Sequence, residues 1–169
     1  GERVLFLTQD ALLADNLLLR TMVDTTIDEN IAQAFCRHTA YPNHSEFIKR
    51  DLEGHFNNLR RDMAWPMGEK DLSNNPRLLY FSSNNCCIYR RDLLQSIPFQ
   101  AVNYGEDQLW TREVMKAGFL KTYVHSTVVI HSHDYEPEET FQRAKTDAAY
   151  WKLLHNYQAP KSWTDLQGM

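Results

Sequence analysis

The stretch from Tyr104 to His133, YGEDQLWTREVMKAGFLKTYVHSTVVIHSH, decides the fold class of this 169-residue sequence because it predicts a helix followed by a strand. Gly105 can adopt a positive φ, which suits a tight turn into a helix. Glu106 and Asp107 would then lie in the first helical turn, where the helix dipole favours negative charge. Gly118 is a typical helix terminator.

The strand after this helix leads into two histidines. Val124–Ile130 is rich in β-branched residues, and His131 and His133 share a face if the strand extends that far. Acids at one end and imidazoles at the other end of one helix–strand unit indicate a functional site. The alternatives are that the acids only complement the helix dipole and that the histidines are ordinary surface residues.

A second polar position lies near the start of the chain. Val4–Leu7 is a short apolar run that predicts a fully buried strand, and Asp10 follows it. Ligand sites of open α/β sheets lie beyond the carboxyl ends of strands, which places Asp10 where a metal or sugar-nucleotide would bind. The alternative is that Asp10 caps a helix that begins near Leu12.

Composition narrows the class of protein. Hydrophobic residues make up 43% and aromatic residues 12%, which is enough for the core of one α/β domain. The net charge of −4 gives no basic surface for nucleic acid. No apolar run approaches the ~20 residues that span a bilayer. Three cysteines, two of them adjacent, form no disulfide framework and favour a reducing, cytoplasmic compartment.

The remaining pattern predicts alternating elements. We expect helices at Leu12–Val23, at Ser45–Arg60, from Arg90 to before Pro98 and from Pro137 to about Tyr157, a strand at Asn85–Tyr89, and a turn-rich loop at Trp65–Asn75. Trp65 could stack on a sugar ring or fill the core. Arg90 and Arg91 could hold a diphosphate or lie on the surface.

Four blocks, taken together and in order, resemble the second half of a family 2 glycosyltransferase, closest to the bacterial rhamnosyltransferase-like group. They are Phe6–Ala11 (FLTQDA), Ser83–Arg91 (SNNCCIYRR), Gly105–Asp107 (GED) and His131–Tyr135 (HSHDY). The resemblance covers residues 3–155. It implies part of a GT-A fold, a mixed sheet flanked by helices, in which residues 1–159 form the C-terminal part of the domain and 160–169 a tail. It also implies a strand at Ile31–Arg37.

The resemblance assigns roles to the polar positions. Asp10 matches the second acid of the strand-end Asp-x-Asp motif, with Thr8 in place of the first, and would bind Mn²⁺ or Mg²⁺ together with His131 or His133. Asp107, or failing that Glu106, would be the general base. The residues that we expect to contact substrate are Thr8, Gln9, Trp65, Asn85, Arg90, Arg91, Gly105 and Trp110.

The implied reaction transfers a sugar from a nucleotide-diphospho-sugar to a glycan or lipid-linked acceptor, with inversion, in bacterial surface polysaccharide synthesis. We expect a cytoplasmic enzyme with peripheral contact to the inner face of the membrane. In the family a nucleotide-binding half precedes the matched region, so we expect the chain alone to bind nucleotide-sugar weakly. The Val4–Leu7 strand would then have an unpaired edge, which favours a homodimer or aggregation.

Two alternatives from other classes remain at this stage. His131, His133 and Glu138 resemble part of the metal motif of a cupin, or of another small metal-dependent enzyme, although the sequence is too helical for an all-β domain. A non-catalytic carbohydrate-binding fragment is the second alternative. A missing metal affinity together with intact acceptor binding would favour the carbohydrate-binding fragment, because the glycosyltransferase and the cupin both use a metal.

Overall fold

The structure, a computed structural model, describes residues 1–59, 65–67 and 76–155. At 65–67, 76–77 and 153–155 it describes the backbone alone. The chain divides into two units, Gly1–Asp134 and Tyr135–Met169, and each is described by itself.

The first unit is built on a mixed sheet. Its described strands are β1 (Arg3–Leu7), β2 (Leu12–Leu13), β3 (Ile31–Thr39), β4 (Trp65–Met67), β5 (Cys86–Arg90) and β6 (Leu120–Ile130). The strand order is β1-β5-β3-β6-β2, and β4 pairs with the first half of β6. β3 and β6 are parallel, whereas β5 is antiparallel to both β1 and β3. The C-terminal ends of β1, β3 and β6 therefore lie at the same end of the sheet, together with the start of β5. We call this end, where strands terminate, the carboxyl edge; it is not the lateral edge formed by β1.

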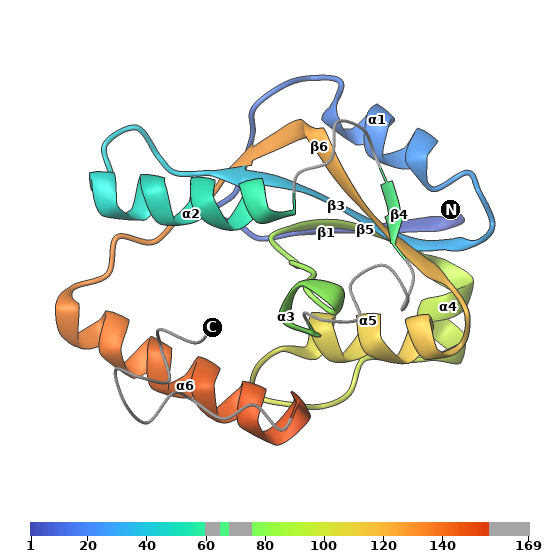
Figure 1. The fold of residues 1–169 in the computed structure, drawn as a ribbon. Helices are drawn as coiled ribbons and strands as arrows, with labels where there is room; N and C mark the ends of the chain where they lie inside the picture. The colour runs from blue at the N-terminus through green and yellow to red at the C-terminus, as the bar shows by residue number, and fades with distance from the viewer. Residues whose placement is uncertain (60–64, 68–75, 156–169) are drawn as a thin grey trace. The chain divides into compact units, whose positions relative to one another are not determined.

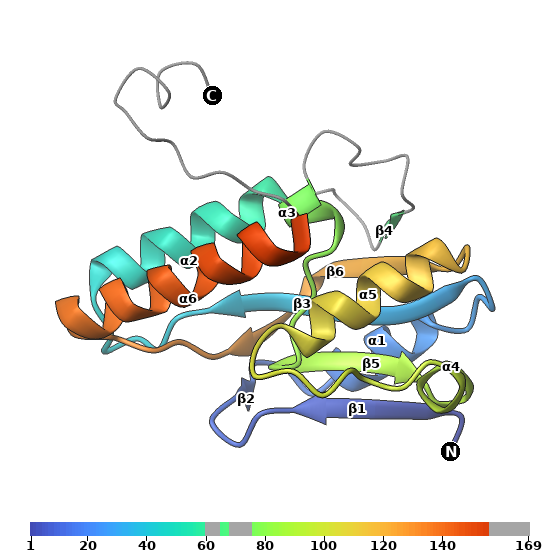
Figure 2. The ribbon, with the colours of Figure 1, turned by 90° about the horizontal axis from the view of Figure 1, so that it is seen from below.

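Helices cover both faces of the sheet (Figures 1 and 2). α1 (Leu18–Thr25) packs on one face through Leu18 and Met22. α2 (Glu46–Asn58) and α5 (Glu106–Lys116) pack on the other through Phe56 and Trp110. The two short helices are α3 (Pro76–Leu79) and α4 (Arg91–Ser96). This arrangement confirms the α/β prediction, and it excludes the all-β domain that the cupin alternative requires.

The helix that the opening stretch predicts is present. It begins at Glu106 after Gly105, whose φ is 76°, and ends before Gly118, whose φ is 93°. Only glycine adopts such φ values readily, so both glycines fix the helix ends. The strand after it is longer than predicted, because β6 begins at Leu120 rather than at Val124.

The helix predicted at Leu12–Val23 is wrong in its first half. Leu12 and Leu13 form β2 and pair with the end of β6, so their backbone groups are used in the sheet. The Asp15 carboxylate then accepts a 2.8 Å hydrogen bond from the Leu17 N–H, and α1 starts only at Leu18. Pairing with β6 therefore outweighs the helical pattern of the leucines.

The first strand is also not fully buried as predicted. β1 stands at the end of the strand order, and among the described strands it pairs only with β5. Leu5 and Leu7 are 37% and 41% exposed. A continuous apolar run therefore marks an edge strand here rather than a central one.

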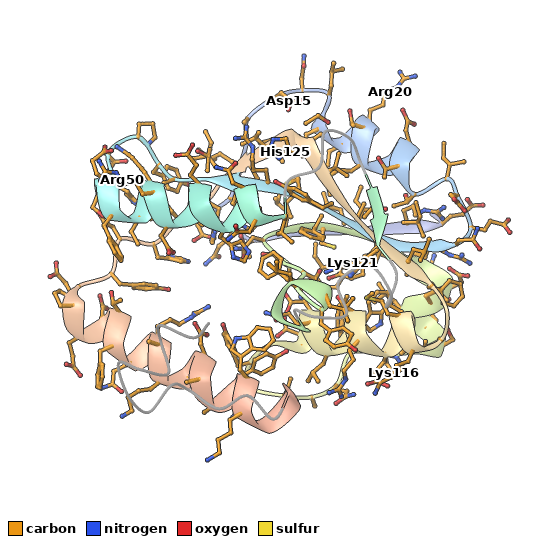
Figure 3. The ribbon with its side chains drawn as sticks, in the orientation of Figure 1. Asp15, Arg20, Arg50, Lys116, Lys121 and His125 are labelled. Atoms are coloured by element: carbon orange, nitrogen blue, oxygen red, sulfur yellow. The ribbon has the colours of Figure 1, made fainter. Side chains whose placement is uncertain are left out.

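A buried lysine anchors the loop that leads into β5. Lys121 of β6, labelled in Figure 3, is fully buried. Its Nζ donates hydrogen bonds of 2.8 and 2.6 Å to the carbonyl oxygens of Leu78 and Phe81. Burial holds the pKa of Lys121 well below its ordinary value. These bonds fix the segment just before residues 82–85, which reach the carboxyl edge.

The second unit contains α6 (Pro137–His155), which begins at the predicted proline. Glu138 and Glu139 lie in its first turn, and the Glu139 carboxylate accepts a 3.0 Å hydrogen bond from the Glu136 N–H. The predicted end near Tyr157 and the predicted tail at 160–169 lie outside the described residues. No helix described in either unit is both long enough and apolar enough to cross a bilayer.

Candidate active site

Three candidate metal ligands meet at the carboxyl edge of the sheet. Asp10 follows β1, and His131 and His133 follow β6. The His131 Nε2 and His133 Nε2 atoms lie 3.5 and 3.8 Å from the Asp10 Oδ2. One ligand atom from each residue falls within 4.8 Å of the others. β1 and β6 end at the same edge of the sheet, and β2, which follows Asp10, pairs with the end of β6, so the three side chains come together.

Their electrostatics suit metal binding at neutral pH. Burial lowers the pKa of His131 although the Asp10 charge acts to raise it, so the imidazole is neutral and offers a lone pair. Slight burial acts to raise the pKa of Asp10, but its own backbone N–H and the histidine charges outweigh burial and lower that pKa. The His131 charge exists only at low pH, because burial lowers the pKa of this residue. At neutral pH the cluster therefore contains one carboxylate and one buried neutral imidazole beside His133.

Alternation along residues 131–134 aims the histidines at Asp10. Ser132 and Asp134 face the other way, toward the chain that follows β3. The Ser132 Oγ accepts a 3.0 Å hydrogen bond from the Tyr41 N–H, and the Asp134 Oδ2 accepts a 2.8 Å hydrogen bond from the Ser45 N–H at the start of α2. The period of two that the sequence predicted for the histidines thus continues beyond the end of β6.

A tight turn holds Asp10 in place. The Ala11 N–H donates to the Thr8 carbonyl oxygen at 3.1 Å, and the Thr8 N–H donates to the Asn85 carbonyl oxygen at 3.3 Å. The Tyr41 hydroxyl donates to the Asp10 carbonyl oxygen at 2.5 Å. Thr8 therefore positions the turn through its backbone, and the exposed Gln9 lies within the turn, next to Asp10.

The acid pair lies at the first turn of α5. Asp107 is held by two backbone donors, with the Asn84 N–H at 3.1 Å from its Oδ2 and the Gln108 N–H at 2.8 Å from its Oδ1. The Glu106 Oε1 accepts a 2.9 Å hydrogen bond from the Asn84 side-chain amide. Burial raises the pKa of Asp107 to about 6, and the neighbouring Glu106 charge adds to the rise.

One turn connects the acid pair with the candidate metal ligands. Asn84 contacts Glu106 and Asp107, while the Asn85 side-chain amide lies 3.0 Å from the His131 Nδ1. Asn85 belongs to the residues predicted to contact substrate, and the structure places it against a candidate metal ligand. Gly105, another of that set, provides the positive φ that starts α5.

Other predicted site residues lie elsewhere. Arg90 is at the opposite end of β5, paired with Arg3 in the register, and its Nη2 contacts the Asp92 Oδ2 at 2.5 Å. The Arg91 N–H donates to the Glu2 carbonyl oxygen in the same region. Trp110 is 1% exposed, and its indole N–H donates to the Ile97 carbonyl oxygen at 2.6 Å. The structure does not bring these residues to the carboxyl edge.

Trp65 is described only in its backbone. It lies in β4, opposite Tyr123 in the first half of β6, whereas the histidines follow the other end of that strand. Its side chain lies outside the described part of the structure.

Sequence reasoning missed Asn84, Tyr41 and Ser132. Each connects segments far apart in the chain, as in the Tyr41 contacts with Asp10 and with Ser132. Asn84 lay within the quoted SNNCC block, yet nothing in the sequence separated its role from that of Asn85.

The chain is 29% identical over 144 residues to the O-antigen chain rhamnosyltransferase RfbN of Salmonella typhimurium. It is 28% identical over 144 residues to the O-antigen chain rhamnosyltransferase WbaN of Salmonella anatum. This is a distant similarity to O-antigen rhamnosyltransferases. Each match covers 83% of this chain and 44% of the relative, so the chain spans less than half the length of these relatives. No protein-family model matches the chain.

Proposed function

We propose that this chain carries the metal side and acceptor side of a glycosyltransferase for surface polysaccharide synthesis. The enzyme moves a sugar from a nucleotide-diphospho-sugar to a hydroxyl of a glycan or lipid-linked acceptor. The observation that carries the proposal is the convergence of Asp10, His131 and His133 at the edge where Asn84 holds the Glu106–Asp107 pair and Asn85 contacts His131. The distant similarity to two O-antigen chain rhamnosyltransferases supports rhamnose as the sugar.

Asp107 is the better candidate for the base. Both its oxygens accept backbone N–H groups, so its position is fixed before substrate binds. Its pKa of about 6 lies near neutral pH, where a carboxylate is ionised and still basic enough to take a proton. Glu106 is the second candidate, and its contact with the Asn84 amide favours a supporting role.

The proposed step is a single displacement. Asp107 accepts the proton of the acceptor hydroxyl as the hydroxyl oxygen forms a bond to the anomeric carbon. The bond from that carbon to the diphosphate breaks, and its electron pair leaves with the diphosphate. Attack opposite the leaving group inverts the anomeric centre.

The residues fit a divalent cation in number and type. One carboxylate and two imidazoles within 4.8 Å of one another can share one ion, and imidazole donors favour Mn²⁺ over Mg²⁺. Asp10, His131 and His133 would hold it, and a cation bound there would neutralise charge on the departing diphosphate. The Asn85 amide contacts the ring nitrogen of His131 that does not face Asp10, as expected for a partner that orients a metal ligand.

The test uses the full-length natural protein that contains this chain. We would measure nucleoside diphosphate release from a panel of nucleotide-diphospho-sugars, including nucleotide-diphospho-rhamnose, with Mn²⁺ and an extract of glycan acceptors. Asp107→Asn should lower turnover by about 10²–10⁴-fold, the usual contribution of a general base. Asp10→Asn should lower turnover and raise the Mn²⁺ requirement.

Asp15→Asn is the matched control for Asp10→Asn, because Asp15 is an exposed acid in the same segment that contacts only the Leu17 N–H among the described residues. It should retain turnover. Turnover that survives both Asp10→Asn and Asp107→Asn would contradict the site assignment. Acceptor binding without turnover of any donor would instead support the non-catalytic carbohydrate-binding alternative.

A further inference from the structure

Asn84 is surrounded by polar contacts although it lies in a short turn before β5. Its side-chain amide nitrogen donates to the Glu106 Oε1 at 2.9 Å, and its amide oxygen accepts from the Tyr89 hydroxyl at 2.8 Å. Its backbone N–H donates to the Asp107 Oδ2 at 3.1 Å. Both ends of the side-chain amide and the backbone N–H of Asn84 are therefore directed at the acid pair or at the buried tyrosine behind it.

Asn85 makes a separate set of contacts on the other side of the turn. Its amide nitrogen lies 3.0 Å from the His131 Nδ1, and its carbonyl oxygen accepts from the Thr8 N–H, two residues before Asp10. This one residue thus touches both segments that carry the candidate metal ligands.

We infer that Asn84 and Asn85 are two positioning residues with different duties, in which Asn84 fixes the acid pair and Asn85 fixes His131. The inference rests on the proposed function and assigns the roles of two adjacent side chains within it. It replaces the substrate-contact role that the sequence predicted for Asn85.

The geometry at His131 explains why an asparagine serves there. The His131 Nε2 lies nearest Asp10; if it were to bind a metal there, the ring proton would be on Nδ1, and Nδ1 would need an acceptor. An asparagine amide presents either its nitrogen or its oxygen by a half-turn, and the oxygen is the group that the metal-binding tautomer requires. Asn85 can therefore hold the ring in one orientation in both tautomers.

The contacts near Asp107 explain why residue 84 is also an asparagine. The buried Tyr89 hydroxyl and the Glu106 carboxylate form hydrogen bonds with the two ends of the Asn84 side-chain amide. These bonds fix the residue so that its backbone N–H points at Asp107. That N–H favours the ionised form of Asp107 and opposes the effect of burial. The titratable groups around Asp107 are Glu106 on its own helix and Cys87 and Tyr89 of β5.

The first arm of the test measures Mn²⁺ binding to this chain by electron paramagnetic resonance. Asn85→Ala should raise the Mn²⁺ dissociation constant by about 10- to 100-fold, the usual effect of losing a partner behind a metal-ligating histidine. Asn85→Asp retains an acceptor for the Nδ1 proton and should bind Mn²⁺ nearly as well as the wild type. Asn84→Ala should leave the Mn²⁺ affinity within about twofold, because it does not contact the ligands.

The second arm follows the Asp107 carboxyl carbon by NMR as the pH is raised, with Asp107→Asn to assign the signal. The wild-type midpoint should lie at about 6. Asn84→Ala should raise the midpoint by roughly 0.5 or more, because the backbone donor to Asp107 is no longer held in place. Asn85→Ala and Asn58→Ala, the latter an exposed asparagine at the end of α2, should leave it unchanged.

The outcomes separate this inference from the proposed function. If His131→Ala abolishes Mn²⁺ binding and Asn85→Ala does not weaken it, the metal site stands and the role of Asn85 is overturned. If the wild type binds no Mn²⁺, both the metal site and the Asn85 role fail, while the Asp107 midpoint still decides the role of Asn84. Equal effects of Asn84→Ala and Asn85→Ala on both measurements would overturn the division of duties.

Discussion

At the scale of single residues, Asp107 is a carboxylate whose burial disfavours its ionised form. Burial raises its pKa to about 6, while the N–H groups of Asn84 and Gln108 limit the rise. A group whose pKa is higher in the folded state than in the unfolded state contributes stability below the unfolded pKa, and this contribution is lost as the pH rises through the folded pKa. The window for Asp107 therefore runs from about 3.8 to about 6.

We predict that the wild-type free energy of unfolding loses at most about 3 kcal/mol through Asp107 as the pH rises through this window. Denaturant titrations of wild type and Asp107→Asn from pH 4 to 7 would measure the loss. Asp107→Asn should show a flatter pH dependence, since the amide does not ionise. Parallel curves for the two proteins would mean that Asp107 titrates at its ordinary pKa.

Lys121 gives a second prediction at this scale. Lys121→Met keeps the side-chain length and leaves the carbonyl oxygens of Leu78 and Phe81 without their buried donor, which should cost about 3 kcal/mol of folding free energy. Lys116→Met is the control, because Lys116 is exposed and its ion pair with Glu113 lies on the surface. It should change stability by less than about 0.5 kcal/mol. Equal losses in the two variants, measured by denaturant unfolding, would refute the role of Lys121.

The sequence supplied the candidate ligands and acids but not the residues that hold them. Asp10, His131 and Asp107 stand at element ends, where motif and strand position together indicate a site. Tyr41 and Asn84 act through contacts with residues distant in the chain, such as Tyr41 with Asp10 and Asn84 with Asp107. Local patterns do not encode such contacts, so sequence reasoning could not find them.

At the scale of elements, helix ends were predictable where glycine or a capping residue fixed them. Ser45 caps α2 by accepting from the Ile48 N–H, and Gly105 precedes α5. The prediction failed at Leu12–Val23, because pairing with β6 took Leu12 and Leu13 into the sheet. Apolar spacing cannot report a strand partner that lies more than a hundred residues away in the sequence.

Substitution of two glycines by alanine should change the stability of the protein in opposite directions. Gly54 lies inside α2, and an added Cβ would meet nothing within 4 Å, so Gly54→Ala should stabilise the protein by about 0.5–1 kcal/mol. Gly118 is equally open but has a φ of 93°, so Gly118→Ala should destabilise it by roughly 1 kcal/mol or more. Thermal unfolding of both variants would check this. A destabilised Gly54→Ala would mean that α2 needs flexibility at that position.

At the scale of the whole molecule, the mixed sheet was predictable in outline, and it explains why the site forms. The resemblance implied a strand at Ile31–Arg37, and β3 occupies Ile31–Thr39. Parallel β1, β3 and β6 bring Asp10 and the histidines to one edge. The apolar composition of β1 wrongly predicted full burial, because such a run occurs in edge strands and in central ones, whereas the resemblance implied the unpaired edge that β1 has among the described strands.

Among the described strands β1 pairs only with β5, and its other side predicts self-association of this chain. Leu5 and Leu7 are partly exposed on the strand, as are Leu19 and Val23 on α1. Unpaired strand edges with apolar side chains pair readily with a second copy. Sedimentation velocity should show dimers or larger species at high concentration, and Leu7→Lys should reduce them. A wild type that sediments as a monomer throughout would contradict the prediction.

The most direct measurement of the central claim is a Mn²⁺ titration of this chain followed by electron paramagnetic resonance. The proposed site predicts one bound Mn²⁺ per chain, loss of binding in Asp10→Asn and in His131→Ala, and unchanged binding in Asp15→Asn. The absence of Mn²⁺ binding in the wild type, or equal binding in all four proteins, would contradict the assignment of Asp10 and the histidines as the metal centre of a glycosyltransferase.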